Sequence, residues 1–224
     1  GLALENVDVL LHEYKGEEAM EQLSRMEKNW EVEWRLAHAM YIRSNSIENV
    51  NERRELIKQA LELAESSFSK NPSSGSAARE AAILSGSLSE LASSSNEQIK
   101  IGAVFKKYLN ATINLLPEPD MAVLHMRGRF AFKMASLSWI ERTYACKLFG
   151  NLPACTYEDA LKDLLAADKV EETLENTLFI AKSYLGNGDK KKAKEYLTRV
   201  IESTPCDTVD EEMIEEAKKK LMKI

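Results

Sequence analysis

The longest uninterrupted helical pattern in the chain covers residues 121–149, which contain no proline and a single glycine. At about 100° of rotation per residue, its apolar side chains form one large face with a stripe of mostly small residues beside it. The large face holds Val123, Phe130, Met134, Leu137, Tyr144 and Leu148, and the stripe holds Leu124, Gly128, Ala131, Ala135, Ser138 and Ala145, widened by Phe132 and Trp139. A helix that is apolar over most of its surface is buried among other helices. The pattern therefore predicts one unusually long central helix.

The remaining face of this helix is polar, and the charged side chains on it are basic. It carries His125, Arg129, Lys133, Ser136, Thr143 and Lys147. Residues 121–150 as a whole have a net charge of +4, whereas the complete chain has a net charge of −6. A basic strip on an acidic protein directs anionic partners to one place. Taken alone, the pattern is equally typical of a solvated face on a core helix.

The rest of the chain is predicted to form helices joined by short turns. Helical pairs are expected at 2–14 with 17–27, 31–45 with 50–70, 75–93 with 97–115, and 175–185 with 190–203, and single helices at 156–168 and 209–223. Asn71-Pro72 and the two prolines at 117 and 119 end helices, because the residue before a proline is disfavoured in the α conformation. Strand-type alternation of apolar and polar residues is missing. The predicted fold class is all-α.

Helical pairs in series suggest an internal repeat, and residues 174–205 fit the 34-residue tetratricopeptide pattern. The matching positions are Ile180, Ala181 and Tyr184 on the first helix, and Ala193, Leu197, Val200 and Pro205 on or after the second. Weaker matches begin at Trp34 and at Leu124, and the pairs at 2–27 and 75–117 match least. Such hairpins bury a core by stacking, so we expect a single tetratricopeptide-like domain over 1–224, capped by the helix at 209–223.

The repeat frame predicts which side chains of each first helix face the concave groove of the stack. For the long helix these include His125, Arg129, Phe132 and Lys133, which largely coincide with its polar face. The other repeats contribute Arg35, Arg43 and Lys182, together with the acidic residues Asp8, Glu80, Glu90 and Glu175. We therefore expect a groove that is basic in part and suited to an acidic peptide or a phosphate-bearing headgroup.

Arg127 and Arg142 fall on the packing side of the predicted long helix. An unpaired charge in such a position is costly, so a structural ion pair or a snorkelling side chain is the favoured interpretation. Glu141 or an acidic residue on a neighbouring helix could be the partner. The alternative is that these two arginines face a ligand.

Charge and composition limit the classes of function. The net charge of −6 argues against broad nucleic-acid binding. The three cysteines at 146, 155 and 206 are odd in number and widely spaced, which is typical of reduced thiols in an intracellular protein. The three histidines lie far apart without metal-ligand spacing, and there is no phosphate-binding glycine loop or nucleophile motif. We expect no metal, no cofactor and no enzymatic activity.

Four segments together resemble one known family. They are Leu137-Ser138-Trp139-Ile140-Glu141, then Leu148-Phe149-Gly150-Asn151-Leu152-Pro153, Tyr157-Glu158-Asp159-Ala160-Leu161 and Ala181-Lys182-Ser183-Tyr184. The chain resembles the regulator of microtubule dynamics proteins, and within them the soluble type-one branch. The resemblance implies a tetratricopeptide-like domain in the cytoplasm and on the cytoskeleton, the mitotic spindle and its poles. It also implies association with microtubules and a contribution to spindle organisation and chromosome segregation.

The leading hypothesis is a microtubule-binding adaptor whose partly basic groove holds the acidic tails of tubulin. The alternative is a phospholipid-binding or transfer module acting at membranes, because another branch of the family is membrane-anchored and linked to phospholipid. In that case Phe130, Phe132, Met134 and Trp139 would line an apolar cavity, and Arg129 or Arg142 would take the phosphate. A clamp for a peptide's terminal carboxylate needs a set of Lys, Asn and Arg residues on adjacent helices, which we do not find.

Overall fold

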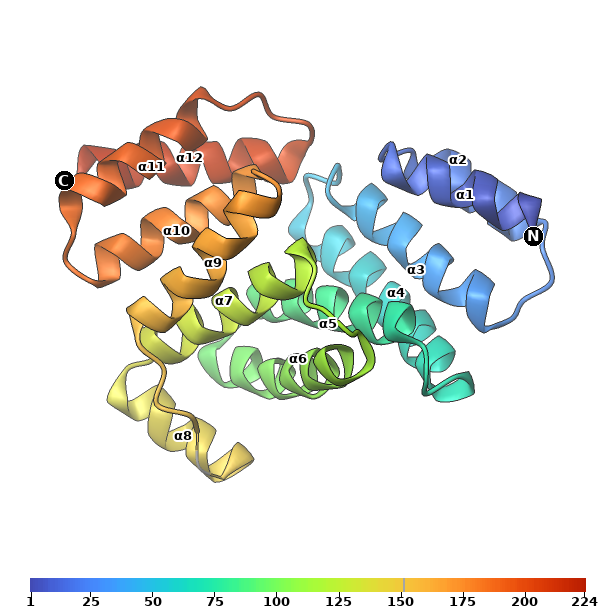
Figure 1. Cartoon of the computed structure of the whole chain (residues 1–224), viewed down its shortest axis with the longest axis horizontal. Coiled ribbons are helices and arrows are strands. Elements are labelled where there is room, and N and C mark those ends of the chain that lie inside the picture. The colour runs from blue at the N-terminus through green and yellow to red at the C-terminus, as the bar shows by residue number, and fades with distance from the viewer. Residues whose placement is uncertain (151) are drawn as a thin grey trace. The chain divides into compact units, whose positions relative to one another are not determined.

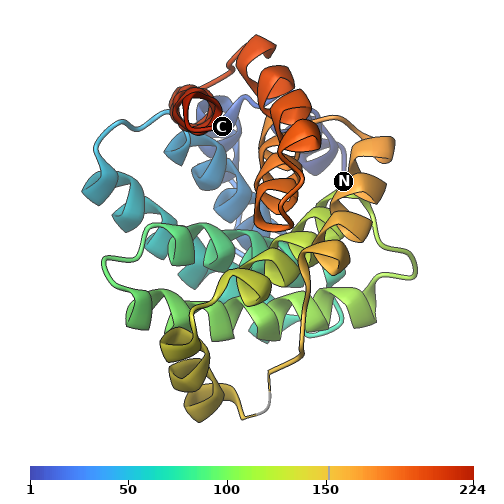
Figure 2. The ribbon, with the colours of Figure 1, turned by 90° about the vertical axis from the view of Figure 1, so that its left-hand side faces the viewer.

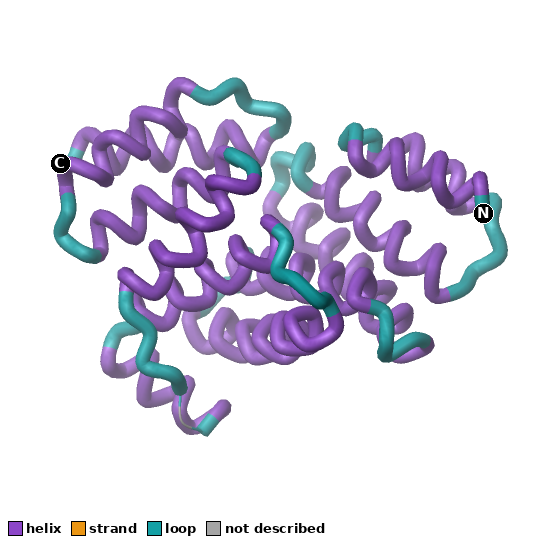
Figure 3. The backbone as a smooth tube through the Cα atoms, in the orientation of Figure 1, coloured by secondary structure: helices purple, strands orange, loops and turns teal. Residues whose placement is uncertain are grey.

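The computed structural model describes residues 1–150 and 152–224, and in these residues it contains twelve α-helices and no strand (Figure 1). Short loops join the helices, as the tube in Figure 3 shows. The all-α prediction is therefore confirmed. The chain divides into two compact units, Gly1–Pro117 and Glu118–Ile224. The expectation of a single domain over 1–224 stays a prediction.

The first unit contains three helical hairpins in sequence order. Its helices are α1 (Leu2–His12), α2 (Gly16–Ser24), α3 (Trp30–Ser44), α4 (Val50–Lys70), α5 (Gly75–Glu90) and α6 (Ser95–Leu115). Each helix packs on the next, and α3 also contacts α1 and α5. Contact between every second helix is the packing of a tetratricopeptide stack, in which successive first helices lie side by side. One core cluster of this unit consists of Val7, Leu11, Ala19, Leu23, Val32 and Ala39.

The second unit repeats this arrangement with one insertion. Its helices are α7 (Met121–Ser136), α8 (Trp139–Phe149), α9 (Tyr157–Val170), α10 (Leu174–Gly186), α11 (Lys190–Glu202) and α12 (Thr208–Met222). The pairs α7–α9 and α10–α11 are the hairpins, α10 also packs on α7 and α9, and α12 covers α10 and α11. The insertion is α8, which projects away from the other helices of its unit (Figures 1 and 2).

The predicted long central helix is wrong, because α7 ends at Ser136 and α8 begins at Trp139. Ser138 accepts a hydrogen bond from the Glu141 N–H at 3.2 Å, and the Glu141 carboxylate accepts one from the Ser138 N–H at 3.1 Å. This capping box satisfies the first free N–H groups of a new helix and so competes with continuation of the old one. As a result Trp139 is 77% exposed and Leu148 46% exposed on α8, instead of continuing the buried face of α7.

Helix starts follow sequence chemistry in most of the described chain. Ten of its helices begin after an Asn, Ser, Thr or Asp whose side chain accepts a backbone N–H three residues on. Thr156 is one of them, and it forms a full capping box with Asp159. None of the described helices has both the length and the apolar character that crossing a bilayer requires.

Small residues let α7 and α9 approach closely. A Cβ atom on Gly128 would lie 2.6 Å from Leu164 Cγ and 3.2 Å from the Leu164 backbone nitrogen. Ala160, Leu164 and Ala167 of α9 are fully buried on the other side of this contact. The close crossing fixes α7 against α9, and α10 then packs on both.

Candidate functional site

The predicted groove residues of the second unit meet where α7 and α10 pack together. His125, Arg129 and Phe132 come from α7, and Glu175, Asn176, Phe179 and Lys182 come from α10; we call these seven residues the α7–α10 cluster. The members on α7 are spaced at three and four residues, as are Glu175, Phe179 and Lys182 on α10. Each set therefore occupies one helix face. Lys133 lies beside Phe132 near the end of α7 and is partly buried.

Two buried aromatic rings form the floor of the cluster. Phe132 and Phe179 meet edge to face, with their ring centroids 5.6 Å apart and their planes at 85°. The Arg129 guanidinium lies 4.4 Å from the Phe179 centroid, and the Lys182 ammonium lies 4.7 Å from the same ring. Cations over a ring face are attracted by its quadrupole, by about 0.5–2 kcal/mol each. The rings thus hold two positive groups in fixed positions.

Carboxylates of the same chain neutralise these cations. Arg129 forms an ion pair with Glu175, and Lys182 Nζ lies 3.5 Å from the Glu216 carboxylate on α12. The Arg129 and Lys182 side chains are each only 17% exposed. Burial disfavours the Glu175 carboxylate, but the charge of Arg129 and the nearby His125 ring outweigh burial and lower the pKa of Glu175 to about 2. Basic residues and acidic partners are therefore interleaved here.

His125 on α7 is packed against α9 and α10 and does not lie on an open surface. Its Nδ1–H donates to Asn176 Oδ1 at 2.8 Å, and Asn176 Nδ2 donates to the Leu164 carbonyl on α9 at 2.8 Å. The ring also packs edge-on against Phe179. Its Nε2 atom is buried without a hydrogen-bond partner among the described residues and lies 3.9 Å from the nearest Glu175 oxygen. The ring is 8% exposed, so a partner at the surface would reach it only in part.

Arg35 and Arg43 lie on α3, in the first unit. Arg35 donates to both carboxylate oxygens of Asp8 at 2.7 and 3.1 Å, stacks 4.3 Å from the Trp34 ring, and is 13% exposed. Arg43 lies 3.8 Å from Glu17, and both of these side chains are well exposed. The basic groove positions of this unit are therefore also matched by acidic side chains of α1 and α2.

The two arginines expected on the packing side have specific partners. Arg127 donates to both oxygens of Asp163 on α9, at 2.8 and 2.9 Å, and this hydrogen bonding raises the pKa of Arg127. Arg142 donates to the Met134 carbonyl at 2.8 Å, which lies in the last turn of α7. A cation at this end of a helix also suits the helix dipole. Both contacts are internal to the second unit.

Comparison with known proteins identifies the family. The model of the family "Regulator of microtubule dynamics protein 1-3" matches residues 3–224. The chain belongs to the regulator of microtubule dynamics protein family. The resemblance noted in the sequence is thereby confirmed.

Curated members of the regulator of microtubule dynamics family align over most of the chain. Regulator of microtubule dynamics protein 1 of Caenorhabditis elegans is 30% identical over 209 residues, which cover 91% of both chains. The Bos taurus protein 1 is 29% identical and aligns with 95% of this chain and 68% of its own length. Protein 2 of Rattus norvegicus is 28% identical, and this chain spans only 45% of its length.

The fold has a solved counterpart outside the regulator of microtubule dynamics family. A thermophilic TPR protein of Thermus thermophilus matches with a TM-score of 0.59 at 16% sequence identity, covering 97% of each chain. At this identity the likeness concerns the fold alone, and it confirms the tetratricopeptide-like prediction. Within the described residues, no group of three or more His, Cys, Asp or Glu side chains is arranged to hold a metal ion.

Two residues that shape this site, Phe179 and Glu216, are not among the predicted groove residues. Phe179 lies four residues after Glu175 and three before Lys182, so helical spacing alone could have placed it between them. Glu216 had no such signal, because its pairing with Lys182 depends on how α12 covers α10.

Proposed function

We propose that this chain is a non-enzymatic adaptor that binds microtubules, regulates their dynamics, and contributes to spindle organisation and chromosome segregation. Family membership carries the proposal, because relatives that align over most of the chain are named regulators of microtubule dynamics. A tetratricopeptide-like stack supports it, since such stacks present extended binding surfaces. The expected location is the cytoplasm, the cytoskeleton, the spindle and its poles, and the expected partner is tubulin, not nucleic acid.

We propose the α7–α10 cluster and the adjacent Lys133 as one contact for an acidic tubulin tail. A tail carboxylate would replace Glu175 at Arg129 or Glu216 at Lys182, while the rings of Phe132 and Phe179 keep the cations in place. Replacing one carboxylate by another gains little, and exposed ion pairs contribute about 0–1 kcal/mol each. Binding through this contact should therefore be modest and should weaken as salt is added.

The test is co-sedimentation with microtubules across a salt series, with intact tubulin and with tubulin whose tails have been removed. The double variant Arg129→Glu with Lys133→Glu should pellet less at low salt, and Glu175→Gln should pellet more because it removes a carboxylate that competes for Arg129. Lys162→Glu with Lys169→Glu, two exposed charge reversals on α9, is the matched control. Undiminished pelleting by a folded double variant would remove the cluster as a contact. No pelleting of the unmodified protein at any salt would refute the function itself.

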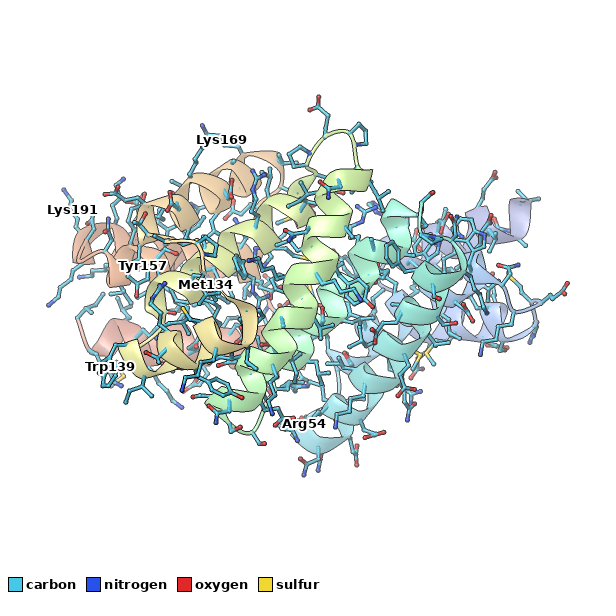
Figure 4. All side chains as sticks on the ribbon, turned by 90° about the horizontal axis from the view of Figure 1, so that it is seen from below. Arg54, Met134, Trp139, Tyr157, Lys169 and Lys191 are labelled. Atoms are coloured by element: carbon cyan, nitrogen blue, oxygen red, sulfur yellow. The ribbon has the colours of Figure 1, made fainter. Side chains whose placement is uncertain are left out.

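A second candidate function, phospholipid binding, is favoured by one observation: the buried Nε2 atom of His125 has no hydrogen-bond partner among the described residues. Because Nδ1 carries the ring proton, Nε2 of the neutral ring accepts, and a hydroxyl group of a phospholipid headgroup near Arg129 would provide the donor. The proposed apolar lining is less favourable, because Trp139 is exposed on α8 (Figure 4) whereas Phe132 is buried in the α7–α10 cluster. Native mass spectrometry of the purified protein decides the question: a co-purifying phospholipid lost in Arg129→Gln supports this function, and its absence together with failure to bind liposomes argues against it.

A further inference from the structure

Eight lysines gather at one end of the α11–α12 hairpin, and we call this set the lysine end. They are Lys190, Lys191, Lys192 and Lys194 in the first turns of α11, and Lys218, Lys219, Lys220 and Lys223 in the last two turns and C-cap of α12. The two helices pack on each other and run in opposite directions, so the start of α11 and the end of α12 lie together (Figures 1 and 2). All eight side chains are exposed except that of Lys220, which is partly buried. Lys191 extends outward from α11 (Figure 4).

The helix dipole explains the positions of the four lysines on α12 but not those of the four lysines on α11. The lysines of α12 follow an acidic first turn and suit the negative end of the helix dipole. The first turn of α11 holds three lysines and no acidic residue after its Asp189 cap, and cations there oppose the dipole. A local arrangement that disfavours the helix is often found at functional sites. The lysines of α11 therefore need an explanation outside the helix.

Ion pairing separates the lysine end from the α7–α10 cluster. In the cluster Arg129 and Lys182 face Glu175 and Glu216 and are mostly buried. In the lysine end, Lys192 is the one member with a carboxylate within 4 Å among the described residues, Glu195 at 3.5 Å, and both of these side chains are about half exposed. Positive charge is thus more accessible at the lysine end than in the α7–α10 cluster. The free N–H groups at the start of α11 add to it.

We propose that the lysine end binds an acidic, unstructured peptide segment. This inference rests on the proposed function, in which such a segment is the acidic tail of tubulin. The ammonium groups are carried on long flexible stems and come from two helices, so they can follow an extended chain of carboxylates through many weak contacts. The exposed carboxylates of Glu195 and Glu215 flank the lysines on the same helices. A flat anionic bilayer would be repelled by these carboxylates, because it would cover them together with the lysines. A single peptide strand can contact the lysines and pass between the carboxylates.

The test compares two charge-reversal variants of the full chain with a control of equal charge change. Lys190→Glu with Lys191→Glu alters α11, Lys218→Glu with Lys219→Glu alters α12, and Lys162→Glu with Lys169→Glu on α9 is the control. Binding is measured to a fluorescent glutamate-rich peptide by anisotropy, to microtubules by co-sedimentation, and to phosphatidylserine vesicles by flotation. Melting temperatures provide the folding check: the α11 variant should melt at or above the unmodified temperature, because glutamates suit the start of a helix.

We expect both lysine-end variants to bind the peptide and microtubules at least about fivefold more weakly than the control. Binding to microtubules that equals that of the control would overturn the inference and leave the proposed function intact. If the unmodified protein binds vesicles but not the peptide, the occupant is a membrane and the inference is also overturned. If the unmodified protein binds the peptide through the lysine end but fails to pellet with microtubules, the proposed function fails while the inference stands.

Discussion

Glu175 provides a quantitative test of the electrostatics of the α7–α10 cluster. The charge of Arg129, together with the nearby His125 ring, outweighs burial and lowers the pKa of Glu175 from 4.5 to about 2. A folded-state pKa below the unfolded-state value means that the ionised carboxylate stabilises the fold above pH 4.5, and that this contribution is lost as the pH falls through 2. At about 1.4 kcal/mol per pKa unit, the contribution is about 3 kcal/mol at pH 7 and falls to roughly half of that at pH 3.

Glu175→Gln removes the titrating group and keeps the shape of the side chain. The free energy of unfolding is measured by urea denaturation, followed by far-UV circular dichroism, at several pH values between 7 and 3. The difference between the unmodified protein and the variant should shrink by about 1–2 kcal/mol across that range.

Glu216→Gln is the matched control for this measurement. Its pair with Lys182 is longer, at 3.5 Å, and the Glu216 side chain is 41% exposed. Exposed pairs contribute about 0–1 kcal/mol. The Glu216→Gln variant should therefore change the free energy of unfolding by less than about 1 kcal/mol at every pH. A Glu175→Gln difference that stays constant from pH 7 to pH 3 would refute the role assigned to the Arg129 pair.

Two further predictions concern helices α7 and α8. Gly128→Ala should lower the free energy of unfolding by about 1–3 kcal/mol, because the new Cβ atom would overlap Leu164. The control is Gly102→Ala on α6, which has open space around it and should raise the free energy of unfolding by about 0.5–1 kcal/mol. Equal effects of the two variants in thermal unfolding would contradict this account. Ser138→Ala should weaken the start of α8 by about 1 kcal/mol, seen as faster hydrogen exchange in α8 with unchanged exchange in α9. Slower or unchanged exchange in α8 would show that the capping box with Glu141 does not hold this helix.

Much of the fold could be predicted because its determinants are local. The hairpins follow from helical periodicity, prolines and caps such as Asn49 and Thr156, and all of these act within a few residues. The division between α7 and α8 was missed although its cause is equally local. The spacing of Ser138 and Glu141 is a capping-box pattern, but the apolar faces on either side of it line up as if one helix continued.

The position of the site and the presence of Glu175 in it were predictable, but the ion pairs that its charges form were not. The repeat frame brought Arg129, Phe132 and Lys182 to one place, because slots on successive first helices are fixed by the stack. The carboxylates that pair with them come from another turn of α10 and from α12, and which acid reaches which base depends on side-chain directions across helix contacts. A count of charges along a single helix cannot contain that information.

The difference between paired and unpaired basic side chains decides where an acidic partner gains the most binding free energy. In the α7–α10 cluster a new carboxylate must displace Glu175, whose lowered pKa measures how strongly Arg129 already favours it. At the lysine end the same carboxylate meets ammonium groups that are solvated and, apart from Lys192, have no carboxylate within 4 Å among the described residues. It also meets the positive end of the α11 dipole. First contact should therefore occur at the lysine end, with salt-dependent on-rates, and the cluster should contribute only after its own ion pairs have opened.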